Sequence, residues 1–378
     1  MNIALAALSC DNVTGIGRIV RSLAAEYVKA GHSTTVITQA FGSVPAGIRP
    51  IRMWRPPVSG AARKLLFSLQ TRSIFSRARF DITNSFGVGR GAQIVTAQSC
   101  HRGGMEAKAR FGRGRLVRNG LGLFDAVSLR DERVLMTGPP PLRVIAVSRL
   151  VKKELIHYYG VSESIIKVIP DGISPIQDRS FAEDREAVRS RSGAGERDFL
   201  LLFIGNEFDR KGLQTIIEAM AILEDRRLRL LVAGDDDGMP YERRAGKLGI
   251  RGQVRFLGKV DGVEGLFKGA DAFVLPTYYE PFGMVVIEAM GAGIPVITSA
   301  DAGAVEDLEH GTHGLFVRDP LSAEELAVQV RRLMDDVELR RRLGAAGREA
   351  SKRFLWERVA GETLDVYSDV IRGRSADR

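Results

Sequence analysis

Cysteine, long apolar runs and low-complexity tracts are scarce or missing in this 378-residue sequence. The two cysteines, Cys10 and Cys100, are too few for a disulfide framework. No apolar run approaches the roughly 18 residues of a membrane-spanning helix. The apolar opening, residues 1–10, has no basic residue ahead of it and no credible cleavage site, which favours a buried strand over a signal peptide. These absences indicate a cytoplasmic globular protein.

The composition is that of a chain with enough apolar residues for two cores. Hydrophobic residues make up 44% and charged residues 27%, which excludes a disordered or fibrous chain. The length exceeds one ordinary domain, so we expect two domains of roughly 150–200 residues each.

Charge is distributed unevenly between the two halves. Residues 1–170 contain 25 Lys and Arg against 9 Asp and Glu, a net charge of +16, whereas the remainder has 30 against 37, a net charge of −7. The basic half suits phosphate-bearing polymers, anionic lipid headgroups or a phosphorylated substrate, with a merely solvated surface as the alternative. Trp54 and Phe67 lie among its arginines, a combination that a membrane surface favours.

Short β-type runs alternate with helical stretches, which is typical of parallel sheets with helices on both faces. The first series of expected strands comprises Ile3–Leu8, Ser33–Thr38, Asp81–Ser85, Gln93–Ala97, Val144–Val147 and Ile165–Ile169. The second comprises Phe199–Ile204, Leu228–Ala233, Val254–Leu257, Ala272–Leu275, Ile294–Thr298 and Leu315–Val317. We therefore predict an α/β chain of two doubly wound Rossmann-like domains, residues 1–175 and 176–354, that face each other and bind ligands at the carboxyl ends of their strands.

Three other stretches complete the expected organisation. Residues 102–136 form a long basic insertion, expected to be partly helical. The acidic, apolar-poor stretch 177–198 indicates the junction between the domains. The last 50 residues are helical, and residues 355–378 are expected to cross back and pack on the first domain.

Two glycine-containing turns open helices directly after strands. Gly15 and Gly17 follow the first strand, and glycine there lets backbone N–H groups approach an anion, although a tight turn explains the pair equally well. The third glycine of a dinucleotide fingerprint is replaced by Val20, which disfavours NAD. Arg210 and Lys211 stand in the second turn, and adjacent cations at the mouth of a sheet suit a diphosphate better than solvent.

The segment from Glu280 to Met290 carries the most specific pattern. Two carboxylates, Glu280 and Glu288, stand eight residues apart, the first in a loop after a strand and the second inside the helix that follows. The first-turn N–H groups of that helix, from Gly283 to Val286, can bind phosphate oxygens. The two carboxylates then suit sugar hydroxyls on either side of a diphosphate.

This segment resembles the Glu-x7-Glu motif of the retaining glycosyltransferases of family 4, which have the two-domain GT-B fold. Phe203-Ile204-Gly205, Arg210-Lys211-Gly212, Phe256-Leu257-Gly258 and Gly293-Ile294-Pro295 stand where the family has its other motifs. Within the family the sequence is most similar to the lipopolysaccharide core glucosyltransferases, which share the Arg-Lys-Gly form, the turn at Gly15 and the basic insertion.

The resemblance implies retaining transfer of a hexose from a nucleotide-diphosphate sugar, preferably a UDP-sugar, without a bound metal or other cofactor. Glu280 would contact the donor sugar, Glu288 the ribose, and Arg210 and Lys211 the leaving diphosphate. The implied donor-binding residues are Gly15, Gly17, Arg210, Lys211, Phe256, Leu257, Glu280, Phe282, Gly283, Met284, Val285, Val286 and Glu288. The first domain would bind the acceptor, an anionic saccharide or glycolipid such as lipopolysaccharide core, and would touch an anionic membrane peripherally.

The sequence departs from the family pattern at two places. Asn206 stands where many members have Arg, which leaves the phosphate charge to Arg210 and Lys211. Gln98 occupies the place nearest to a family His or Asp and cannot act as a base, so His101 becomes the candidate catalytic group on the acceptor side.

Several alternatives stay open at the level of sequence. A member of the same fold could use GDP-mannose on a lipid-linked or small-molecule acceptor, or isomerise its nucleotide sugar as a 2-epimerase. A nucleic-acid-binding protein would explain the basic half but no donor site, and we expect no nucleic-acid partner. Asp235, Asp236 and Asp237 resemble a metal-binding cluster, but their place before a Gly-Met-Pro turn favours a solvated loop.

Overall fold

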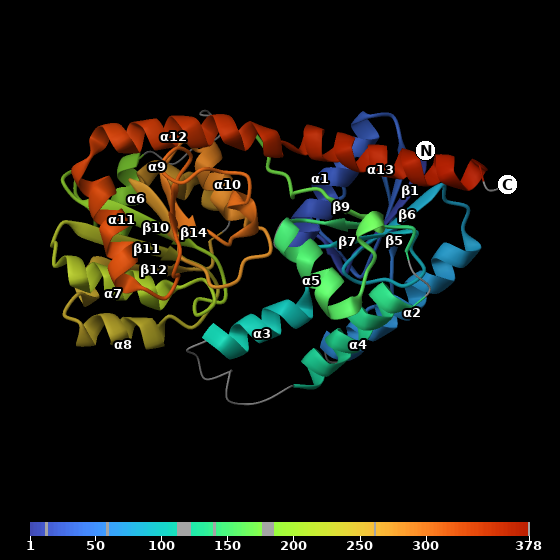
Figure 1. The fold of residues 1–378 in the computed structure, drawn as a ribbon, viewed down its shortest axis with the longest axis horizontal. Helices are drawn as coiled ribbons and strands as arrows, with labels where there is room; N and C mark the ends of the chain where they lie inside the picture. Colours follow the sequence, from blue (N-terminus) through green and yellow to red (C-terminus); the bar gives the residue numbers. More distant parts are fainter. Residues whose placement is uncertain are drawn as a thin grey trace. The chain divides into compact units, whose positions relative to one another are not determined.

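The computed structural model describes residues 1–11, 14–57, 60–111, 122–138, 141–175, 185–260 and 262–376. The chain divides into two compact units (Figure 1). Unit 1 comprises residues 1–106, 115–172 and 354–378, and unit 2 comprises residues 107–114 and 173–353. Each is a Rossmann-like α/β layer structure, as predicted. Residues 176–184, where the sequence places the domain boundary, lie outside the described residues.

Unit 1 contains a seven-stranded parallel sheet of order β5-β3-β1-β6-β7-β8-β9. The strands are β1 (Asn2–Ala6), β3 (Ser33–Thr38), β5 (Ile48–Arg52), β6 (Ile82–Phe86), β7 (Ile94–Ala97), β8 (Arg143–Ala146) and β9 (Ile166–Val168). Two short strands, β2 (Ser9–Cys10) and β4 (Ala40–Phe41), pair beside it. The central strand β1 places Leu5 between Val36 and Asn84, and its residues 3–6 are buried because helices cover both faces of the sheet.

Helices α1 (Gly15–Lys29) and α13 (Trp356–Ala376) pack together on one face of this sheet (Figure 1). The stripe predicted for α1 is buried, and its Tyr27 ring lies 5.7 Å from that of Tyr367 in α13. Asn84 donates a hydrogen bond of 2.7 Å to the Tyr367 hydroxyl, which ties α13 to β6. The prediction that the C-terminal helix crosses back onto the first unit is therefore confirmed.

Helix α2 (Gly60–Arg77) packs with α4 (Leu123–Thr137), and α2 also contacts the sheet. Phe67 of α2 is fully buried against Ala4, Ala6 and Ile37, so the expectation that it joins Trp54 at a membrane surface is wrong. The periodicity of α2 is weak, which explains why the sequence did not predict this helix. The basic insertion forms α3 (His101–Phe111) and α4, while residues 112–121 between them lie outside the described residues. Helix α5 (Arg149–Tyr159) follows β8.

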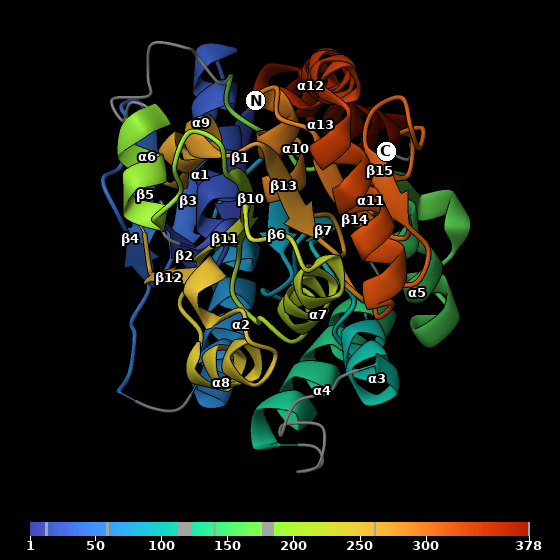
Figure 2. The same cartoon turned by 90° about the vertical axis from the view of Figure 1, so that its left-hand side faces the viewer.

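Unit 2 contains a six-stranded parallel sheet of order β12-β11-β10-β13-β14-β15. Its strands are β10 (Phe199–Ile204), β11 (Leu228–Ala233), β12 (Val254–Gly258), β13 (Ala272–Leu275), β14 (Val296–Ser299) and β15 (Leu315–Val317). Helices α7 (Leu213–Leu223), α8 (Met239–Lys247) and α11 (Ala323–Asp335) lie on one face (Figure 2). Helices α6 (Arg185–Ser192), α9 (Leu266–Gly269), α10 (Met284–Gly291) and α12 (Val337–Ser351) lie on the other (Figure 1).

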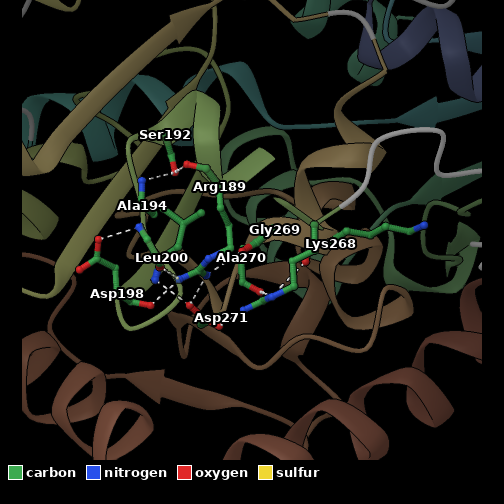
Figure 3. Close-up of polar contacts among 11 residues, drawn as sticks. Arg189, Ser192, Ala194, Asp198, Leu200, Lys268, Gly269, Ala270 and Asp271 are labelled. Carbon is green, nitrogen blue, oxygen red and sulfur yellow. Dashed lines mark hydrogen bonds and ion pairs between the residues drawn. The ribbon is translucent and has the colours of Figure 1, made fainter. Parts of the chain in front are cut away.

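Residues 185–198 belong to the core of unit 2, which corrects the expectation that they are a junction. Arg189 of α6 is only 7% exposed and lies 2.9 Å from an Asp271 carboxylate oxygen (Figure 3). Its guanidinium also donates to the carbonyls of Gly195, Asp198 and Gly269 at 2.6, 2.6 and 3.1 Å. One buried cation thus joins α6, the loop before β10 and the end of α9, a role that the acidic composition of the segment conceals.

Candidate active site

The predicted donor residues gather at the topological switch point of unit 2. Strand order changes direction between β10 and β13, and in open α/β sheets ligands bind at the carboxyl ends of the strands at such a point. Residues 205–212 follow β10 and residues 276–283 follow β13. These loops carry Arg210, Lys211 and Glu280, which the structure brings into contact.

The loop after β10 is shaped around the Lys211 side chain. Gly205 has a φ of 153°, and a Cβ atom there would lie 2.5 Å from Lys211 Cδ, so only glycine leaves room for this side chain. Thr277 Oγ1 and the Tyr278 amide donate to the Arg210 carbonyl, both at 3.1 Å, which fixes the loop to the end of β13. The two cations are therefore held by glycine packing and main-chain hydrogen bonds.

Glu280 is the acceptor for both cations. Lys211 Nζ lies 2.9 Å and Arg210 Nη1 3.4 Å from Glu280 Oε2, and Arg210 Nη1 also donates to the Tyr279 carbonyl. Side-chain exposure is 14% for Arg210, 12% for Lys211 and 9% for Glu280. Burial acts to raise the pKa of Glu280, but Lys211 and then Arg210 outweigh it and hold the pKa below its ordinary value. Glu280 is therefore a carboxylate that accepts hydrogen bonds and cannot serve as a proton donor near neutral pH.

Helix α10 begins directly behind this cluster. Gly283 is its N-cap with a φ of 101°, and a Cβ atom there would lie 3.0 Å from Glu280 Cγ. The amides of Gly303 and Ala304 donate to the carbonyls of Glu280 and Phe282 at 3.1 and 2.8 Å, which holds the turn in place. First-turn amides of a helix have no partner within the helix, and the N-cap of α10 packs against Glu280, which contacts both Arg210 and Lys211. Cations and amides on one side suit a polyanion.

The other residues predicted to bind the donor lie in α10 or in and beside an aromatic cluster. Val286 and Glu288 are buried in α10, with Glu288 one turn or more beyond Gly283. Phe256 of β12 lies 6.2 Å from the Phe208 ring and packs beside Gly238, while Leu257 is half-buried. This cluster positions the loop between β10 and α7 because Phe208, at its centre, belongs to that loop.

Two of the three consecutive aspartates, Asp236 and Asp237, accept main-chain hydrogen bonds in turns. Asp236 accepts hydrogen bonds of 2.8 Å from the amides of Phe208 and Asp237, and Asp237 accepts one of 3.0 Å from Met239. Asn206 accepts a hydrogen bond of 2.7 Å from the Asp235 amide. Asn206 therefore joins the loop after β10 to the loop after β11. No group of three potential metal ligands occurs among the described residues.

In unit 1, Gly15 and Gly17 begin α1 in different surroundings. A Cβ atom on Gly17 would lie 2.5 Å from Thr14 Oγ1 and 2.7 Å from Asp11 Oδ1, so its glycine is required by packing. Asp11 accepts from the Thr14 amide at 2.8 Å, and Thr14 caps Gly17 at 3.0 Å. Apart from its chain neighbours and the backbone of its own helix, no described atom lies within 4 Å of a Cβ position on Gly15, which leaves room for a close approach there.

Gln98 has a partner that sequence reasoning missed. Its amide donates a hydrogen bond of 3.1 Å to the Asp171 carboxylate, and both residues line a small cavity with Thr96, Trp356 and Thr363. Burial raises the pKa of Asp171 to about 7, although the bond from Gln98 acts to lower it. In the sequence, Pro170-Asp171-Gly172 indicates only a turn, and nothing in it points to Gln98 as a partner.

His101 begins α3 within a polar network of unit 1. The His101 amide donates to Glu132 at 2.8 Å, and His101 Nε2 lies 3.2 Å from Asp125 Oδ1. Tyr159 also donates to Glu132. A structural role explains these contacts of His101, so a catalytic role of His101 stays a prediction. Cys10 and Cys100 are buried, and burial raises the pKa of each thiol, to about 11 and about 12 respectively, which leaves both inert.

Comparison with known proteins gives the class. A model of the family Glycosyl transferases group 1 matches residues 184–350, and a model of Glycosyltransferase Family 4 matches residues 13–176. The chain therefore belongs to the glycosyltransferases of family 4 with the GT-B fold, and it is a transferase by family.

Individual proteins of known name show which glycosyltransferases this chain is similar to. The chain is 35% identical over 232 residues to an uncharacterised glycosyltransferase of Methanocaldococcus jannaschii and 32% identical over 229 residues to the lipopolysaccharide glucosyltransferase WaaG of Escherichia coli. These matches cover 60% and 57% of this chain, and 59% and 58% of the relatives, so less than two-thirds of each relative is matched. The crystal structure of WaaG, a glycosyltransferase involved in lipopolysaccharide biosynthesis, has the same fold, with a TM-score of 0.80 at 24% identity over 97% of this chain and 99% of that one. No helix of the described residues has the length and apolar character needed to cross a membrane.

Proposed function

We propose that this protein transfers a hexose, with retention of anomeric configuration, from a nucleotide-diphosphate sugar to a glycan or glycolipid. The observation that carries the proposal is the cluster of Arg210, Lys211 and Glu280 beside the first turn of α10. Two buried cations and the first-turn amides of a helix suit the diphosphate, and a buried carboxylate that stays ionised suits sugar hydroxyls. UDP-glucose is the first donor to test, because the WaaG relative is named a glucosyltransferase.

The proposed transfer reaction depends on the charged side chains near the bond between the sugar and the diphosphate. The bond between the anomeric carbon and the phosphate oxygen breaks while the acceptor oxygen bonds to that carbon from the same face. Negative charge develops on the leaving diphosphate, where Arg210 and Lys211 stabilise it. The proton of the acceptor hydroxyl passes to the leaving phosphate oxygen, so the chain needs to supply no general base. Because side-chain cations take up the phosphate charge, we propose that transfer proceeds without a metal or other cofactor.

We propose further that the acceptor is anionic, such as a phosphorylated lipopolysaccharide core, and binds unit 1. Support comes from the net charge of +16 in residues 1–170 and from the likeness to WaaG. The same charge, with Trp54 64% exposed, suits peripheral contact with the inner face of the cytoplasmic membrane. Transfer and liposome binding should both weaken as salt is raised, and indifference of both to salt would refute the anionic acceptor.

Thermal stabilisation by a panel of UDP-, GDP-, ADP- and dTDP-sugars tests the donor site. A ligand that binds the folded state raises Tm with its concentration relative to Kd. We expect one nucleotide family to raise Tm, and the rise to be lost in Glu288→Ala. If GDP-mannose is the nucleotide sugar that raises Tm, the proposed donor changes but the proposed donor site stands. If none of the nucleotide sugars raises Tm, the donor site is refuted.

A further inference from the structure

Glu207 is a carboxylate beside the proposed phosphate site to which no role has been assigned. It lies in the loop between β10 and α7, three residues before Arg210. Its φ of 56° is in the left-handed region, which non-glycine residues rarely adopt. The Lys211 amide donates to the Glu207 carbonyl at 3.0 Å and holds this conformation. The Glu207 side chain, 49% exposed, is aimed at Arg210.

The N–H groups of the Arg210 guanidinium already face oxygen atoms of the protein itself. Arg210 Nε lies 3.4 Å from Glu207 Oε2, and its Nη1 faces Glu280 and the Tyr279 carbonyl. Burial acts to raise the pKa of Glu207, but Arg210 and Lys108 outweigh it and lower the pKa, so Glu207 is ionised near neutral pH. Two cations therefore face two carboxylates, and each carboxylate competes electrostatically with a diphosphate for them.

The two carboxylates differ in how easily they can withdraw. Glu280 is 9% exposed, and its main chain is held by the Gly303 amide. Glu207 is half exposed and has a second cation within reach, because Lys108 Nζ lies 2.9 Å from its Oε2. Lys108 belongs to unit 2, as Glu207 does. Glu207 can therefore leave Arg210 without losing all its ionic contacts.

We propose that Glu207 is a placeholder for the donor diphosphate: it orients Arg210 before the donor binds and gives way when the phosphates arrive. This inference rests on the proposed function and concerns the same site. As a positioning residue, Glu207 lowers the affinity for every ligand with a diphosphate, including the nucleoside diphosphate product. Its competition for Arg210 therefore speeds product release.

Calorimetric titration with UDP and with uridine tests the proposal in the full-length protein and in Glu207→Gln. The variant keeps the side-chain size and removes the charge. We expect its Kd for UDP to fall about threefold, as for loss of one partly exposed charge contact, while its Kd for uridine stays unchanged because uridine has no phosphate. UDP inhibition of transfer should strengthen by the same factor.

Glu224→Gln is the matched control. Glu224 is exposed, has a φ of 50°, and lies at the opposite end of α7, so this variant removes an equal charge from an equal backbone conformation. Its Kd for UDP should equal that of the parent. Glu207→Gly, which relieves the left-handed backbone, should also bind UDP more tightly and serves if Glu207→Gln fails to fold.

The outcomes separate the placeholder from the proposed function. Equal or weaker UDP binding by Glu207→Gln overturns the placeholder, and so does a parallel change in uridine binding, which would indicate a general rearrangement. If UDP binds neither the parent nor either variant, the proposed UDP donor itself fails.

Discussion

Replacing Glu280 by glutamine should affect stability and sugar transfer through one set of contacts. Glu280 is 9% exposed and faces Lys211 Nζ at 2.9 Å and Arg210 Nη1 at 3.4 Å. Complete loss of one partner of a buried ion pair costs about 3–5 kcal/mol. Glutamine keeps the volume and one acceptor oxygen, so we expect about 2 kcal/mol for Glu280→Gln. For a unit of this size that corresponds to a Tm lower by about 4–8 °C.

The same variant should separate phosphate binding from sugar transfer. UDP affinity should stay equal to that of the parent or rise, because Arg210 and Lys211 lose a competing carboxylate. Transfer should fall about 100-fold, because the contact with the donor sugar is weakened. Scanning calorimetry, UDP titration and a product assay measure the three effects, with Glu224→Gln as the unaffected control. An unchanged Tm, or a UDP affinity that falls with activity, would refute the reasoning.

Two further predictions concern buried charges outside the donor site. Arg189→Ala should destabilise unit 2 by about 3–5 kcal/mol in urea unfolding, because it removes a buried cation that pairs with Asp271 and donates to three main-chain carbonyls, whereas Arg185→Ala, which removes a half-exposed partner of the same carboxylate, should cost less than about 1 kcal/mol. Equal costs would contradict this role of Arg189. Asp171→Asn should make the protein more stable than the parent above about pH 7, since burial raises the pKa of Asp171 from 3.8 to about 7 and its ionisation then opposes folding. The gain should vanish below about pH 4, and a gain that does not vary with pH would contradict it.

Buried parallel strands and the donor motifs were readable from the sequence because their signals are local. The runs Phe199–Ile204 and Leu228–Ala233 are continuous apolar segments, and the structure has β10 and β11 over the same residues. Arg210, Lys211 and Glu280 were identified by their place after strands, and parallel strands bring such loops to one edge. The crossing of α13 onto unit 1 was likewise predicted correctly.

Long-range pairings account for what the sequence did not show. The partner of Gln98 is Asp171, 73 residues away, and nothing near either residue indicates the other. Arg189 looks like a surface residue in a polar segment, yet its partner Asp271 lies 82 residues along the chain. The arginines near Phe67 indicate a surface, and Arg72 and Arg77 are indeed exposed, but the Phe67 ring packs against the sheet.

A crystal of the full chain soaked with UDP would test the central claim most directly. The account predicts difference density for the diphosphate between the loops after β10 and β13, within hydrogen-bond distance of Arg210, Lys211 and the first-turn amides of α10. A diphosphate bound elsewhere, with no contact to either cation, would contradict the assignment of the donor site.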